Sequence, residues 1–156
     1  LFVTPAPALR HQALLMRLLR VIDPYVETHQ LGYAMVSPAD VELTADTVVQ
    51  PDLFVITRLE GERPRSWSEI GPLLLAIEIL SPSTAHVDRT VKRRRYQLAG
   101  IPEYWIVDGD ARVVERWRPQ DERPEIMSER LEWQPEPTLQ ALAIDLSALF
   151  TQALGA

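Results

Sequence analysis

The chain has 156 residues, a net charge of −6 and no cysteine, with 46% hydrophobic and 24% charged residues. These values fit one globular domain over residues 1–156 with a substantial core, and they suit a cytoplasmic protein. They exclude disulfides, thiolate metal sites and cysteine nucleophiles, and no apolar run approaches the roughly 20 residues of a membrane span.

The charge of the whole chain counts against a nucleic-acid partner. Strong nonspecific binding to DNA usually requires a basic surface, so only a local basic patch can support such a partner here. Of the 16 basic residues, Lys92 is the one lysine, and the others are arginines. The chain begins at Leu1 rather than at methionine, so we expect further residues upstream.

The first half of the chain predicts a helix followed by strands. Helical spacing of leucines predicts a helix over Ala8–Ile22, which we expect Pro24 to end. Strands are predicted at Gly32–Val36, Asp40–Leu43 and Val48–Ile56, the last with Pro51 and Asp52 inside it, before a loop over Leu59–Gly71. His11 lies near the start of the helix, where a histidine is usually a surface or capping residue.

The stretch from Leu73 to Gly100 is the central unit of the sequence. Leu73–Leu80 is a continuous apolar run, which predicts a strand covered on both faces, and its one charge is Glu78. Burying this carboxylate is costly unless a cation lies beside it. After the SPST turn, in which Ser83 or Thr84 can cap a helix, we expect a helix that ends at Gly100.

That helix carries Asp88 and Lys92 at an i, i+4 spacing, so both lie on one face. We expect Val87, Val91 and Leu98 to form its buried stripe and Lys92 to lie off that stripe.

The last third of the chain predicts a hairpin and a closing helix. The hairpin strands are Glu103–Asp108 and Val113–Trp117, a polar loop covers Arg118–Arg130, and the helix spans Leu139–Leu154 with Asp145 and Ser147 as caps. With three strands (Asp40–Leu43, Val48–Ile56, Leu73–Leu80) before the second helix and one after it, the order predicts a mixed sheet flanked by helices.

Two carboxylates on central strands suggest a metal site. If the strands that carry Asp52 and Glu78 are neighbours, the two side chains can converge on magnesium or manganese, which prefer hard oxygen ligands. Such an ion polarises a phosphate oxygen, and Lys92 on the adjoining helix would stabilise charge that builds on the phosphate.

Structural roles remain open for each of these residues. Asp52 can be a turn residue, Glu78 can pair with Arg94 as a buried ion pair, and Asp88 with Lys92 can be a surface pair. Asp108 is expected to be a turn residue. His86, Asp88 and Tyr96 are candidates for supporting the site. Arg93, Arg94 and Arg95 form either a solvated face or a phosphate-binding one.

Several segments in order carry a family resemblance. The segments are PAPALRHQ, SPADVEL, QPDLFVI, LAIEILSPST, DRTVKRRRY and GIPEYWIVD. Together they resemble the Uma-two family, described as putative restriction endonucleases, within the PD-(D/E)XK nuclease superfamily. The resemblance covers nearly the whole chain. It implies a restriction-endonuclease-like αβββαβ core and a magnesium- or manganese-dependent endonuclease acting on DNA.

By this resemblance Asp52 and Glu78 are the metal ligands and Lys92 is the catalytic cation. Two features depart from the general pattern. Leu80 stands where the superfamily has lysine, so Lys92 has to act from the helix. A glutamate that family members carry upstream would precede Leu1. The alternative function is a non-catalytic DNA-binding or protein-interaction domain that keeps the fold. A two-fold homodimer is expected if both strands are cut.

Overall fold

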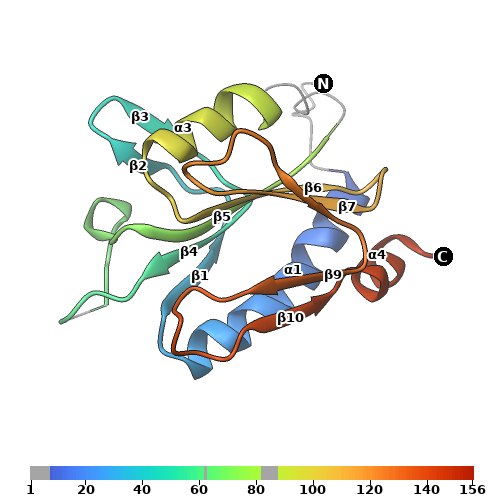
Figure 1. The fold of residues 1–156 in the computed structure, drawn as a ribbon. Helices are drawn as coiled ribbons and strands as arrows, with labels where there is room; N and C mark the ends of the chain where they lie inside the picture. Colours follow the sequence, from blue (N-terminus) through green and yellow to red (C-terminus); the bar gives the residue numbers. More distant parts are fainter. Residues whose placement is uncertain (1–7, 62, 82–87) are drawn as a thin grey trace, which may run out of the picture.

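In a computed structural model of the chain, residues 8–61, 63–81 and 88–156 are described, except for the side chain of Asp88 (Figure 1). The centre is a six-stranded sheet in the order β1-β4-β5-β6-β7-β8. Its strands are β1 (Gly32–Val36), β4 (Leu53–Thr57), β5 (Leu73–Ile79), β6 (Glu103–Asp108), β7 (Val113–Trp117) and β8 (Glu125–Met127). The β5–β6 pair is parallel and the other pairs are antiparallel, which confirms the predicted mixed sheet.

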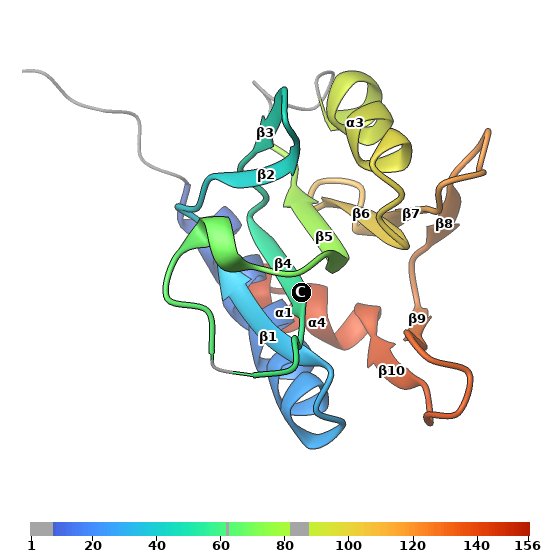
Figure 2. The same ribbon diagram turned by 90° about the vertical axis from the view of Figure 1, so that its left-hand side faces the viewer.

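Different elements cover the two faces of this sheet (Figures 1 and 2). On one face lie α1 (Leu9–Thr28), α4 (Leu146–Leu154) and the hairpin of β9 (Arg130–Trp133) and β10 (Leu142–Asp145). On the other lie the π-helical turn η2 (Asp88–Lys92), α3 (Arg93–Leu98) and the hairpin of β2 (Val41–Thr44) and β3 (Thr47–Val49). Alternate residues of β4 and β5 therefore enter two separate cores.

The order α1, β1, β4, β5, α3, β6 gives the predicted αβββαβ core, with one strand reassigned. Asp40–Leu43 was expected in the main sheet, but β2 pairs with β3 in a separate hairpin and β1 takes its place. The predicted strand Val48–Ile56 is likewise two strands. It breaks at the Pro51-Asp52 bend, where the Ser37 N–H donates to the Asp52 carbonyl. Proline has no N–H to continue a ladder there.

The prediction that Pro24 ends the first helix is wrong, because α1 continues to Thr28. Proline removes the hydrogen bond to the carbonyl of Arg20, and both residues lie on the exposed side of the helix, where that carbonyl is open to solvent. Val26 is fully buried, and its burial favours the last turn. Tertiary packing here outweighs the local cost of the proline.

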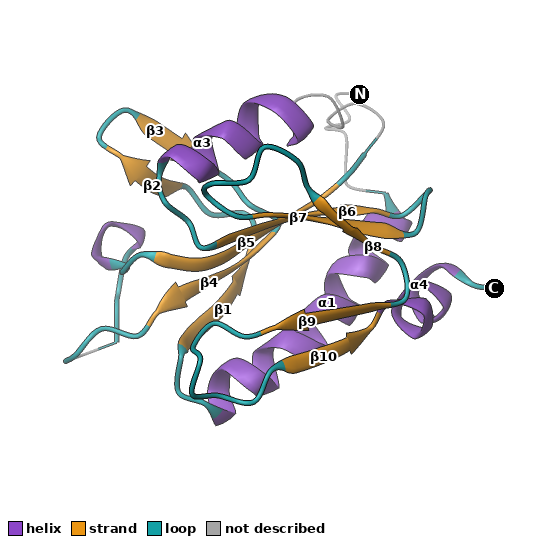
Figure 3. Cartoon of the chain, in the orientation of Figure 1, coloured by secondary structure: helices purple, strands orange, loops and turns teal. Residues whose placement is uncertain are grey.

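The closing helix is shorter than predicted (Figure 3). Leu142–Asp145 forms β10 against β9 and buries Ile144, so α4 begins only at Leu146. Asp145 is its cap, as predicted, and accepts a hydrogen bond of 2.9 Å from the Ala148 N–H, whereas Ser147, also predicted as a cap, lies inside the helix. Within the described ranges, no helix has the length and apolar character that crossing a bilayer requires.

The buried face of the second helix also differs from the prediction. Val91 and Leu98 are 45% and 85% exposed, whereas Tyr96 is fully buried. Val87 and the SPST capping residues Ser83 and Thr84 lie outside the described residues. The helix begins with the π-helical turn η2. Lys92 and Tyr96, one turn apart, both face the sheet and contact Glu78, and α3 ends before Gly100 as predicted.

Candidate active site

Glu78 on β5 is buried, with 3% of its surface exposed, and it contacts two side chains from the covering helix. Lys92 Nζ lies 3.3 Å from Glu78 Oε2. The Tyr96 hydroxyl donates to Glu78 Oε1 at 3.2 Å, and its ring stacks on Tyr104 with centroids 4.4 Å apart. The cation beside the buried carboxylate is therefore the chain's one lysine rather than Arg94. Tyr96, proposed as a supporting residue, contacts Glu78 directly.

Asp52 lies at the bend just before β4 and is fixed through one carboxylate oxygen. Its Oδ2 accepts the backbone N–H of Ile79 at 2.7 Å and lies 3.2 Å from His11 Nε2. The other oxygen, Oδ1, accepts no hydrogen bond from the described part of the chain. Asp52 lies at a bend, but in the described part of the chain its side chain contacts the end of β5 and His11 rather than the backbone of its own turn, so it ties the bend to β5.

His11 is a site residue that the sequence did not reveal. Its side chain is 15% exposed, and it reaches Asp52 from the first turn of α1, across the sheet from Lys92. Nothing in its local sequence separates it from a capping histidine. The signal is tertiary, because α1 has to pack beneath β4 and β5 before the contact exists.

The register of the sheet brings the two carboxylates to adjacent strands. Leu53 pairs with Ile77 in the antiparallel β4–β5 ladder, and one further step of this register sets Asp52 opposite Glu78. Opposed residues in such a ladder have Cα atoms about 4.5–5.5 Å apart. Their contacts come from different sides, since Asp52 meets His11 and Glu78 meets Lys92 and Tyr96.

Asp52 and Glu78 offer carboxylate oxygens, the kind of donor that magnesium and manganese prefer. No group of three or more His, Cys, Asp or Glu side chains suited to a metal occurs among the described residues. A pair of carboxylates therefore has to be completed by water or a ligand. Magnesium is commonly held in this way, by one or two carboxylates together with substrate phosphates.

Arg89 fixes η2, and with it the start of the helix that carries Lys92. Its Nε donates to Glu115 Oε1 and its Nη2 to Asp108 Oδ2, both at 2.9 Å. Asp108 also accepts the N–H groups of Asp110 and Ala111, so it is the predicted turn residue. Burial alone would raise the pKa of Asp108. The backbone N–H of Ala111 and the Arg89 guanidinium outweigh burial and lower it.

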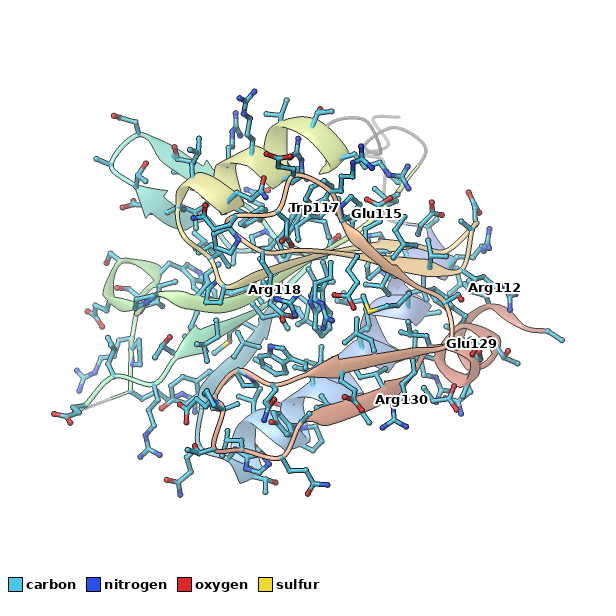
Figure 4. The ribbon with its side chains drawn as sticks, in the orientation of Figure 1. Arg112, Glu115, Trp117, Arg118, Glu129 and Arg130 are labelled. Atoms are coloured by element: carbon cyan, nitrogen blue, oxygen red, sulfur yellow. The ribbon has the colours of Figure 1, made fainter. Side chains whose placement is uncertain are left out.

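The arginine run after Lys92 divides between packing and solvent. The Arg93 guanidinium lies 4.4 Å from the ring centre of Trp117 and donates to Gln97, so Arg93 packs on the sheet. Figure 4 labels Glu115 and Trp117 on the α3 side of the sheet. Arg94 and Arg95 are exposed and give α3 a basic surface. His86 and the Asp88 side chain, both candidate supporting groups, lie outside the described part.

Comparisons with known proteins agree with this architecture. A search of curated proteins finds no match. A solved structure described as a putative nuclease belonging to DUF820, from Anabaena variabilis, matches with a TM-score of 0.71 and 24% identity, covering 98% of this chain and 87% of that one. That likeness shows the fold. The model of the Uma2 family, described as "Putative restriction endonuclease", matches residues 1–147. Because this match spans nearly the whole sequence, the chain belongs to the Uma2 family of restriction-endonuclease-like proteins.

Proposed function

We propose that this protein is a metal-dependent endonuclease that hydrolyses phosphodiester bonds in DNA. The observation that carries the proposal is the contact of 3.3 Å between Lys92 and Glu78. Glu78 lies on β5 opposite Asp52, which directly precedes the neighbouring strand β4. An ion pair serving only stability would need no second carboxylate in register with it. Membership of the Uma2 family supports the same reaction class.

Asp52 and Glu78 would hold magnesium or manganese, and the bound ion would polarise a phosphate oxygen and lower the pKa of a water. The protein's own groups prepare this site. The Tyr96 hydroxyl orients Glu78, while the Ile79 N–H and His11 hold Asp52 by Oδ2 and leave Oδ1 toward a ligand. These contacts fix both side chains before substrate arrives.

Lys92 would stabilise negative charge on the phosphate during the reaction. Its side chain is 26% exposed, so the ammonium lies between the buried carboxylate and solvent, where a phosphate can approach. The exposed Arg94 and Arg95 would bind neighbouring phosphates. These arginines supply the local basic patch that a chain with a net charge of −6 needs in order to bind DNA.

We expect the protein to nick supercoiled plasmid DNA in manganese or magnesium, and a chelator to abolish that activity. The physical reason is that two carboxylates hold a divalent ion only loosely, so the chelator removes it. Conversion of supercoiled to open-circular plasmid on a gel measures the reaction. Activity that persists in the chelator would contradict the proposal. A protein that binds plasmid but never nicks it would support the non-catalytic alternative.

His11 should act by positioning Asp52. We expect His11→Ala to lower the nicking rate about 10–100-fold, the usual cost of losing a group that orients a metal ligand. His29→Ala is the matched control, because His29 lies at the other end of α1 and contacts the Tyr25 ring. Raised manganese should recover part of the His11→Ala loss. If the two variants have equal rates, His11 has no role at the site.

A further inference from the structure

A second concave site lies at the edge of the sheet, outside the residues discussed above. A pocket of about 580 Å³ opens between the edge strand β1 and the segment of residues 63–70, which includes the short helix η1 (Trp67–Glu69). Its walls are mostly apolar and aromatic, with arginines at the rim. The lining includes Tyr33, Met35, Ile56, Arg63, Arg65 and Trp67.

The side chains of this pocket are suited to a flat, anionic ligand. The Arg63 guanidinium lies over the Tyr33 ring, 4.8 Å from its centre. The Trp67 ring packs on Phe54, with centroids 5.7 Å apart, yet Trp67 remains 39% exposed. Aromatic rings anchored on one side and open on the other bind nucleobases by stacking, and guanidinium groups bind the phosphates beside them.

The pocket opens on the same face of the sheet as Glu78. Tyr33 pairs with Ile56 across β1 and β4, and Ile56 belongs to the core on the α3 side, together with Tyr96. Along β4, Ile56 is four residues from Asp52, or about 13 Å. That span corresponds to about four nucleotides of a stacked strand and fewer of an extended one.

The acidic side chain closest in sequence to Trp67 is directed at the protein. Glu69 Oε2 accepts the backbone N–H of Arg65 at 2.9 Å. This contact ties the short helix to the loop that precedes it and turns the Glu69 charge toward the backbone.

We propose that this pocket binds one unstacked nucleobase of the DNA strand on which the candidate active site acts. The inference rests on the proposed function and names its substrate class. The base stacks on Trp67, while Arg63 and Arg65 contact adjacent phosphates. A base inside an intact duplex already stacks on both faces, so entry requires single-stranded or locally unpaired DNA. The enzyme therefore prefers such DNA over continuous duplex.

Binding measured in a chelator, without cleavage, tests the pocket separately from the reaction. The probe is a fluorescein-labelled single strand of about 12 nucleotides, compared by anisotropy with the same strand carrying one abasic position and with its duplex. For the wild type we expect the single strand to bind more tightly than the duplex. At one position in the strand, loss of the base should weaken binding about fivefold to a hundredfold.

Two variants and a matched control complete the experiment. Trp67→Ala should weaken binding of the intact strand and remove the abasic effect, and Arg63→Ala should weaken intact and abasic strands alike. Arg130→Ala is the control, since Arg130 pairs with Glu132 on β9, beneath the other face of the sheet (Figure 4). If Trp67→Ala fails to melt cooperatively, Ser66→Glu replaces it, because Ser66 is exposed at the rim and a carboxylate there should repel the strand.

Equal binding of single strand and duplex, no position sensitive to base loss, or wild-type behaviour of the pocket variants would each overturn the inference. A free nucleotide that competes as strongly as the oligonucleotide would overturn it too, by assigning the pocket to a small molecule. If the wild-type protein shows the abasic effect in the chelator but never nicks plasmid, base binding in the pocket is supported and the proposed nuclease activity is not.

Discussion

Replacing Lys92 with alanine should abolish plasmid nicking, and replacing it with arginine should not restore the activity. Lysine presents a compact charge beside Glu78 Oε2 at 3.3 Å. A guanidinium is planar, longer and directed toward paired acceptors, so it would displace the charge by on the order of 1 Å, which costs about a hundredfold in rate. The measurement is the nicking rate of each variant in saturating manganese.

Thermal and urea unfolding of the same variants separate catalysis from stability. Lys92→Ala leaves a carboxylate that is 3% exposed without its cation, so we expect it to lower the free energy of unfolding by about 1–3 kcal/mol. Lys92→Arg keeps a charge and should lose less. The exposed Arg95→Ala is the control for removing a helix cation. If Lys92→Arg nicks plasmid at the wild-type rate, Lys92 serves only as the counter-ion of Glu78 and has no specific role in the reaction.

Replacing Glu78 with glutamine should abolish both manganese binding and nicking while leaving the fold intact. The amide can still accept the Tyr96 hydroxyl, and Lys92 is exposed enough to turn toward water. We therefore expect the free energy of unfolding without metal to stay within about 1 kcal/mol of wild type. Calorimetric titration with manganese measures the loss of the ligand.

Glu103→Gln is the matched control for this experiment. Glu103 is also a buried carboxylate, and it lies at the other end of β6 from Ile106, the partner of Glu78. Burial raises its pKa, although the Trp105 N–H and Arg116 oppose the shift. Removing its charge should leave the manganese titration unchanged. Equal heats from Glu78→Gln and wild type would show that the ion binds elsewhere.

The centre of the fold is predictable because a charged residue lies in an otherwise apolar strand. One charge in a continuous apolar run has to find a cation, and the single lysine of the chain lies on the next helix. The sequence requires a cation there but leaves Arg94 as an alternative partner, and the structure places Lys92 against Glu78. The mixed sheet is predictable from the order of the apolar runs and turn residues along the chain.

Other features of the site and fold depend on tertiary contacts, which the local sequence does not reveal. The contact of His11 with Asp52 exists only after α1 packs under the sheet. The buried face of the second helix was misassigned because Lys92 and Tyr96 contact Glu78, so the apolar Val91 and Leu98 remain exposed. Pro24 was misread because burial of Val26 outweighs the lost hydrogen bond.

We propose that Asp52 and Glu78 hold one metal ion next to Lys92. Anomalous diffraction from crystals soaked in manganese tests this site most directly, since the scattering locates the ion itself. We expect one peak within about 2.0–2.6 Å of an oxygen of each carboxylate, with Lys92 Nζ beside the same ligand sphere. A peak that contacts only one of the carboxylates, or no peak between them at saturating manganese, would contradict it.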